Sequence, residues 1–204
     1  MARLTVACVL RKSKTYDAEY VERLQAGIIE HLKTPHRFVC LSDVEVPCER
    51  IPLEHDWPGW WAKIELFKLK GPVLCFDLDT TIVGDLSDIA SSVPVMTFIA
   101  LRDFYREDGL GSGMMGWSGD VSSLYRAFCS KPGFCMERYR GLGDQGFLED
   151  RIHAAKWQDL VPGQVVSYKV HCKESVPKGA RVVCFHGKPK PHELPQNHVL
   201  REHW

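Results

Sequence analysis

The stretch "VLCFDLDTTIVGDL" occupies residues 73–86 and places two acidic residues directly after an apolar run. Such a run is typical of a strand that is covered on both faces of a sheet. Side chains alternate along an extended chain, so Asp77 and Asp79 project to one side and Leu78 to the other. Two carboxylates at a strand end repel each other unless a cation or a shared proton compensates, and divalent cations with phosphate oxygens are the usual partners. The pattern favours a metal site; the alternative is a pair of solvated acids in a turn near Gly84.

The segments around this strand alternate between β and helical patterns. Toward the N-terminus, the sequence predicts strands at 3–10, 36–43 and 49–53 and helices at 18–32 and 60–69. Further on, it predicts strands at 95–104, 164–170 and 181–187, helices at 120–130 and 147–155, a Gly-rich segment at 109–117 and a polar turn at 138–146. Strands that alternate with helices predict a single α/β domain with a central mixed, mostly parallel sheet, whose ligands bind beyond the carboxyl ends of the strands.

The composition fits one globular domain. The 204 residues are 45% hydrophobic, which is enough for a substantial core. Lys plus Arg and Asp plus Glu balance at 26 each, so we expect no broad surface for nucleic acid. The eight cysteines occur singly, as reduced thiols do, and the first apolar run is too short to cross a bilayer. We therefore expect a cytoplasmic protein without a transmembrane segment.

The acidic strand alone resembles the first motif of haloacid dehalogenase-like phosphatases, through "VLCFDLDTT". That resemblance implies Asp77 as the nucleophile, Asp79 as the acid/base and Lys131 as the family's lysine. The family usually carries this motif on its first strand, whereas the predicted strands at 3–10 and 36–43, a short third strand at 49–53 and two predicted helices precede it here. The candidate for its later acidic motif, "GLGDQGFLED" at 141–150, does not follow a predicted core strand. A phosphatase is therefore kept as an alternative.

A second resemblance covers most of the chain. The order of its motifs is similar to that of small GT-A glycosyltransferases, nearest to glycosyltransferase family 8 and related bacterial and phage proteins. The resemblance implies one GT-A domain over 1–204. Residues 1–80 would form the nucleotide-binding half that ends in Asp-x-Asp. Residues 81–204 would form the sugar and acceptor half, with "HGKPKP" near its end.

The first segment that carries this resemblance is "WWAKIELFKL", residues 60–69. It stands where the family has a helix with a basic residue that contacts the donor, which implies this role for Lys63. The neighbouring Trp60 and Trp61 are candidates for the core or for the wall of the sugar pocket. We expect at least one of them in the core.

The second segment, "GLGSGMMGW", resembles the part of the family that lies beneath the donor sugar. It implies Ser112 and Gly113 as donor-binding residues, because small residues let the backbone approach a ligand closely. The family's usual Asn is absent here. The alternative is a plain Gly-rich turn.

The third segment, "GDQGFLED", resembles the family's Asp-Gln-Asp motif, with Gly146 as a departure. The resemblance implies that Asp144 binds sugar hydroxyls or the acceptor. It also implies that Gln145 lies beside the reacting carbon, where a neutral amide would stabilise a developing oxocarbenium ion. The alternative for Asp144 is a helix cap.

The fourth segment, "VVCFHGKPKPHEL", resembles the C-terminal signature His-x-x-Gly-x-x-Lys-Pro-Trp. Gly187 and Lys190 match and would bind the diphosphate of the donor. Cys184 stands where the family has a metal-binding histidine, and we expect His186 to replace it as a ligand, since Mn²⁺ accepts one nitrogen among oxygens.

Taken together, the motifs imply a metal-dependent glycosyltransferase that moves a hexosyl group, with retention, from a nucleotide-diphosphate sugar. The acceptor would be a glycan, a protein, a lipid-linked glycan or modified DNA. The implied cation is Mn²⁺ or Mg²⁺, held by Asp77, Asp79 and His186 together with the donor phosphates. The nucleoside would rest against the loop after the first strand, around Leu10 to Lys12 and Tyr16, and against residues near Asp77. A catalytically degenerate nucleotide-sugar-binding protein is the third alternative.

Overall fold

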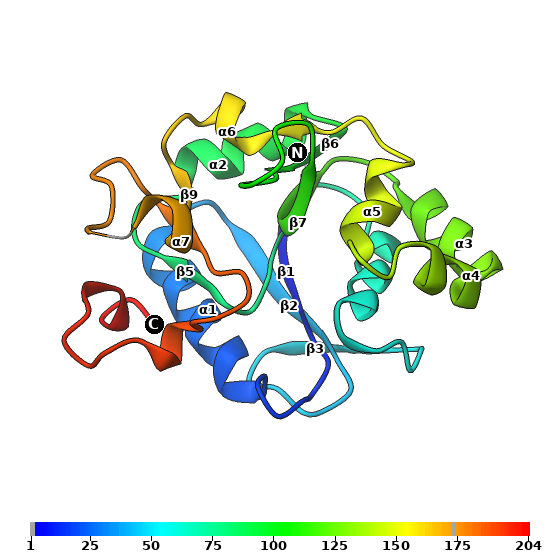
Figure 1. The fold of residues 1–204 in the computed structure, drawn as a ribbon, viewed down its shortest axis with the longest axis horizontal. Coiled ribbons are helices and arrows are strands. Elements are labelled where there is room, and N and C mark those ends of the chain that lie inside the picture. Colours follow the sequence, from blue (N-terminus) through cyan, green and yellow to red (C-terminus); the bar gives the residue numbers. More distant parts are fainter. Residues whose placement is uncertain (1–2, 173) are drawn as a thin grey trace.

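The computed structural model describes residues 3–172 and 174–204 and has a mixed seven-stranded sheet at its centre (Figure 1). The strand order is β3-β2-β1-β4-β7-β6-β8, and β7 alone runs antiparallel to its neighbours. The strands are β1 (Leu4–Leu10), β2 (His36–Ser42), β3 (Glu49–Pro52), β4 (Val73–Phe76), β6 (Phe98–Arg102), β7 (Leu110–Trp117) and β8 (Ala155–Lys156). The expected α/β fold with a mostly parallel sheet is confirmed.

Helices cover both faces of this sheet (Figure 1). The helices of the described residues are α1 (Ala18–His31), the 3₁₀ helix η1 (Gly59–Lys68), α2 (Ser87–Ser92), α3 (Ser122–Ser130), α4 (Pro132–Arg138), α5 (Asp144–Glu149), α6 (Trp157–Leu160) and α7 (Tyr168–His171), with short 3₁₀ turns at Val93–Val95, Pro191–Glu193 and Val199–Arg201. Alternation along β1 divides the core, because Cys8 and Leu10 pack on the α1 side and Ala7 packs on the η1 side. Within the described ranges, no helix has both the length and the apolar character needed to cross a membrane.

A second, small sheet joins the middle of the chain to its C-terminal part. It contains β5 (Thr80–Ile82), β10 (Val182–Cys184) and β9 (Val165–Ser167), in the order β5-β10-β9. Thr80, the residue after Asp79, is paired with Cys184 across the antiparallel β5 and β10. This pairing brings the segment that follows β10 next to the acidic pair.

The helix predicted at 60–69 is a 3₁₀ helix, and its sequence explains the difference. A 3₁₀ helix has three residues per turn, so side chains three positions apart share a face. Trp61, Ile64 and Phe67 have this spacing and are buried in the core that also contains α3. The same spacing places Trp60 and Lys63 on another face of η1, and both line the pocket described below.

Three other segments differ from the prediction. The Gly-rich segment forms β7, where Gly116 is needed because a Cβ there would lie 3.0 Å from the indole of Trp157. The helix predicted at 147–155 is α5, which begins earlier, after Gly143 turns the chain at φ +61°. The strand predicted at 164–170 ends at Ser167, whose hydroxyl accepts from the backbone N–H of Val170 and caps α7.

Candidate active site

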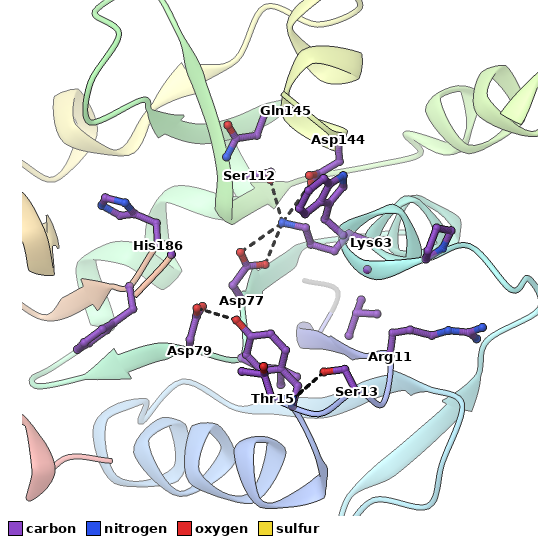
Figure 2. A pocket seen from close by; sticks show the side chains of 18 of the residues that line it. Arg11, Ser13, Thr15, Lys63, Asp77, Asp79, Ser112, Asp144, Gln145 and His186 are labelled. Carbon is purple, nitrogen blue, oxygen red and sulfur yellow. Dashed lines mark hydrogen bonds and ion pairs between the residues drawn. The ribbon is translucent and has the colours of Figure 1, made fainter. Parts of the chain in front are cut away.

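A pocket of about 700 Å³ opens where β1 and β4 end. Figure 2 shows its side chains, with Asp77 near the centre. The loop between β1 and α1 lies on one side of Asp77 and contributes Arg11, Ser13 and Thr15. Asp144 and Gln145 lie on the other side (Figure 2). The pocket is thus located at the carboxyl edge of the sheet, where ligands of α/β proteins bind.

Most of the residues singled out from the sequence meet in this pocket. Those that line it are Lys12, Tyr16, Lys63, Asp77, Asp79, Ser112, Asp144, Gln145, His186, Gly187 and Lys190. Leu10 does not line it, because strand alternation turns its side chain into the core and places Val9 and Arg11 in the pocket wall. Gly113 lies behind Asp77 instead, and its carbonyl accepts from the backbone N–H of Asp77 at 2.8 Å.

Several lining residues carry no motif and were missed by the sequence reading. They are Arg11, Ser13, Thr15, Asp56, Pro58 and Leu142, among others. Arg11 forms an ion pair with Asp56, with 3.1 Å between Nη2 and Oδ1. The only signal for Arg11 is its position just after the first strand, and the only signal for Leu142 is the polar turn predicted at 138–146. Asp56 lies in a stretch for which no element was predicted.

Lys63 is the centre of a buried network on one side of the pocket (Figure 2). Its Nζ donates to Asp77 Oδ1 at 3.0 Å and to Ser112 Oγ at 2.9 Å, and it lies 3.1 Å from Asp144 Oδ2. Burial lowers the pKa of Lys63, but the carboxylates of Asp144 and Asp77 outweigh it, so the pKa lies above its usual value. Burial raises the pKa of Asp144, and the charge of Lys63 opposes that rise. The network therefore holds a charged ammonium group against the acidic strand end.

Asp79 forms a second network with residues from both ends of the chain. Its Oδ2 accepts from Tyr16 Oη at 2.9 Å and from Lys190 Nζ. Burial and the nearby Asp77 raise the pKa of Asp79, and the bonds from Lys190 and Tyr16 oppose the rise. Burial and Asp79 raise the pKa of Tyr16, so its phenol stays protonated and donates. A second ammonium group, Lys190, thus lies at the same edge of the sheet as Lys63.

His186 lines the pocket but is not brought to the two carboxylates. Its Nε2 lies 2.7 Å from Ser167 Oγ, and its ring stacks on Phe104 and meets Tyr105 edge-on. Burial lowers the pKa of His186, which favours the neutral ring. Throughout residues 3–172 and 174–204, no group of three or more His, Cys, Asp or Glu side chains is gathered to hold a metal ion. His186 therefore does not complete a ligand set with Asp77 and Asp79 in this structure.

Asp77 and Asp79 do fit a divalent cation as a pair of oxygen ligands. Both line the same pocket, Asp77 half-buried and Asp79 buried, and each is paired with a single lysine ammonium group. Mg²⁺ is commonly held by one or two carboxylates together with phosphate oxygens of a substrate, so the donor set does not require a histidine.

The haloacid dehalogenase-like alternative is met only in part: Asp77, Asp79 and Asp144, the last from its candidate for the later acidic motif, line the pocket together. Lys131, the candidate for the family's lysine, lies at the junction of α3 and α4 and is outside the set of described residues that line the pocket. The lysine beside Asp77 is Lys63, which precedes the acidic strand in the sequence.

Comparison with known structures identifies the fold. The chain is similar to the glycosyltransferase GlyE of Streptococcus pneumoniae TIGR4, at 14% identity and a TM-score of 0.62 over 98% of this chain and 58% of GlyE. It is also similar to the galactosyltransferase LgtC, solved with donor and acceptor sugar analogs, at 12% identity and a TM-score of 0.59 over 92% of this chain and 88% of LgtC. The fold is that of the GT-A glycosyltransferases. The bifunctional glycosyltransferase WbbM aligns at 13% identity and a TM-score of 0.58, over 93% of this chain and 46% of WbbM.

These likenesses concern the fold alone, because the identities are low. The chain spans 58% of GlyE and 46% of WbbM, less than two thirds of either protein. No family model and no curated protein sequence matches the chain. What the GT-A fold does in this protein has to be argued from its own pocket.

Proposed function

We propose that this protein transfers a hexosyl group from a nucleotide-diphosphate sugar to an acceptor. The observation that carries the proposal is the arrangement of two lysine–aspartate pairs, Lys63 with Asp77 and Lys190 with Asp79, in one pocket of a GT-A fold. Two ammonium groups beside an acidic strand end suit a ligand that carries a diphosphate and a divalent cation.

The donor diphosphate is assigned to the part of the pocket near Lys190 and Gly187. Gly187 has φ +67°, and a Cβ there would lie 3.0 Å from Lys169 Nζ, so the backbone of this turn is suited to glycine. The nucleoside is assigned to the loop between β1 and α1, with Lys12 and Tyr16. The positive charges of Lys63 and Lys190 would offset the negative charge that develops on the departing nucleoside diphosphate.

The cation is proposed to be Mn²⁺ or Mg²⁺. Held by Asp77, Asp79 and the donor phosphates, it would act as a Lewis acid that adds positive charge beside the leaving group. With a cation as partner of Asp79, Lys190 would turn from that carboxylate to the phosphates, whereas Lys63 would stay held by Asp144 and Ser112.

The donor sugar is assigned to the side of the pocket with Asp144 and Gln145. Asp144 binds Lys63 and so fixes the position of that ammonium group; a sugar hydroxyl is its further proposed partner. The neutral amide of Gln145 would stabilise an oxocarbenium-like carbon without attacking it as a strong nucleophile. Retention is proposed from the resemblance to glycosyltransferase family 8. The eight free thiols suit a reducing compartment, and we propose the cytoplasm.

A thermal-shift panel tests the proposal. UDP-, GDP-, ADP- and CDP-sugars are added with and without Mn²⁺, and one nucleotide with Mn²⁺ is expected to raise the melting temperature by binding the folded state. Asp79→Asn should abolish the Mn²⁺-dependent part of the rise in melting temperature, whereas Asp85→Asn, a change at an exposed residue, should keep it. If no nucleotide responds, the donor site is refuted.

Two further assays separate the alternatives. Release of free nucleoside diphosphate from the responding donor supports a transferase. Binding without any transfer or hydrolysis indicates the degenerate binding protein. Formation of a phosphoryl-enzyme from an aryl phosphate, lost in Asp77→Asn, would instead support the phosphatase.

A further inference from the structure

Trp60 presents an indole ring at the pocket wall. All six tryptophans of the chain fall within the described residues, and Trp60 is the exposed one, at 54%. Its neighbour Trp61 is 5% exposed and packs on Phe128 in the core. A large exposed aromatic side chain that lines a pocket commonly marks a binding surface.

The position of this indole is fixed by the backbone opposite it. A Cβ on Gly143 would lie only 2.4 Å from Nε1 of Trp60, so the ring rests directly on a residue that has no side chain. Gly143 has φ +61° and is followed by Asp144, the first residue of α5. The indole is therefore held beside the two residues to which the transfer chemistry is assigned, Asp144 and Gln145.

An exposed apolar side chain lies in the same pocket as Trp60. Leu142 lines the same pocket and is 44% exposed, and Gly141 next to it also lines the pocket. Polar groups lie close by, since Lys63 shares a face of η1 with Trp60 and Gln145 follows Asp144. A flat apolar surface with polar groups at its edge is complementary to a pyranose ring, which has an apolar face of C–H groups and hydroxyls around its rim.

We propose that the exposed face of Trp60 is the stacking platform for a hexose ring of the acceptor, so that the acceptor is a carbohydrate. This inference rests on the proposed function and names the substrate class of the same site. The nucleoside is assigned to the opposite side of Asp77, at the loop that carries Ser13 and Thr15 (Figure 2). A ring on Trp60 would instead lie next to Asp144 and Gln145, where the acceptor hydroxyl has to meet the donor sugar.

The test measures carbohydrate binding and transfer in the full chain. Lactose, cellobiose, maltose and methyl β-galactoside are titrated while the tryptophan fluorescence is recorded, with Trp60→Phe as the blank for the signal of Trp60. Transfer is measured as acceptor-dependent release of nucleoside diphosphate. At least one of these sugars should change the fluorescence of the wild type and stimulate release.

Three variants carry the comparison. Trp60→Ala should raise the KM for the responding sugar about tenfold, equivalent to about 1.4 kcal/mol, with a small change in kcat. Trp60→Phe should keep most of the affinity because it keeps an aromatic face. Phe134→Ala is the matched control, since Phe134 is 59% exposed on α4 and lies outside the described residues that line the pocket.

The outcomes separate this inference from the proposed function. A wild type that responds to no nucleotide refutes the proposed function itself. If nucleotides bind but no sugar of the panel responds, or if Trp60→Ala transfers like the wild type, the platform alone is refuted. If Trp60→Ala weakens binding of a free nucleoside diphosphate, the ring stacks a nucleobase; if it weakens only the nucleotide-sugar, the ring belongs to the donor sugar. Either result overturns the assignment to the acceptor.

Discussion

The ammonium group of Lys190 binds the carboxylate of Asp79, although 111 positions separate the two residues in the sequence. The pairing of β5 with β10 makes this contact, because it sets the segment after Cys184 beside the segment before Thr80. One of the two ammonium groups that pair with the acidic strand end therefore comes from the C-terminal part of the chain.

Lys190→Met should weaken binding of the responding nucleoside diphosphate about tenfold or more, because one of two cations facing the phosphates is lost. Calorimetric titration in the presence of Mn²⁺ measures the effect. Lys188→Met is the control, since Lys188 is 83% exposed in its side chain and contacts Glu193 rather than the pocket acids. Equal affinities for the two variants would contradict the role of Lys190.

Lys63→Met should destabilise the fold by about 3 kcal/mol, because it leaves the buried Asp144 without its ionic partner. Urea unfolding at pH 7 measures the loss. The double variant Lys63→Met/Asp144→Asn should be more stable than Lys63→Met, since the uncompensated charge has been removed. If the stability lost by the double variant equals the sum of the losses of Lys63→Met and Asp144→Asn, Lys63 and Asp144 do not act as a pair.

Glu65→Ala should destabilise the fold by about 3 kcal/mol, since the removal of a buried acceptor leaves several donors unpaired. The carboxylate of Glu65 is fully buried and accepts from the backbone N–H groups of Glu54 and His55 and from Lys68 Nζ. Glu65→Gln keeps one acceptor oxygen and should lose less. The exposed Glu107→Ala is the control and should stay within about 0.5 kcal/mol of the wild type.

Asp103→Asn should make the free energy of unfolding fall less steeply as the pH is lowered. Burial raises the pKa of Asp103, but hydrogen bonds from the backbone of Tyr105 and from Arg106 outweigh it, so the pKa lies below its usual value. A carboxyl group whose pKa is lower in the folded state stabilises the fold at pH values above its pKa in the unfolded chain, about 3.9. This stabilisation is lost as the pH falls through the pKa of the folded state. Urea unfolding between pH 5 and pH 3 measures the slope. Parallel profiles for the wild type and the variant would exclude Asp103 as a source of the acid sensitivity.

The sheet and much of the pocket could be predicted from the sequence because their signals are local. The apolar run before Asp77 identifies a buried strand, and the order of motifs around it places Lys63 and Lys190 at the same edge. The common direction of Asp77 and Asp79 follows from the alternation of side chains along an extended chain alone. These inferences depend on residues close together in the sequence or on the order of segments.

The remaining features depend on tertiary packing. Whether Leu10 or its neighbours face the pocket depends on which side of β1 meets α1, and the sequence of β1 is apolar on both sides. His186 follows a strand as a ligand would, but Ser167 and Phe104 meet it from distant segments. The contact of Trp60 with Gly143 likewise joins η1 to the turn before α5, two segments whose approach no local pattern records.

The pairing of β5 with β10 also bears on how the protein is made. A ribosome that has completed Asp79 has another 111 residues to add before Lys190 exists. Since β5 has its partner only after β10 has left the exit tunnel, the nascent chain carries an acidic strand end with an unfinished neighbourhood while the residues in between are added. The proposed capacity to bind a nucleotide sugar would therefore arise only after β10 and Lys190 have been added, rather than growing with the chain.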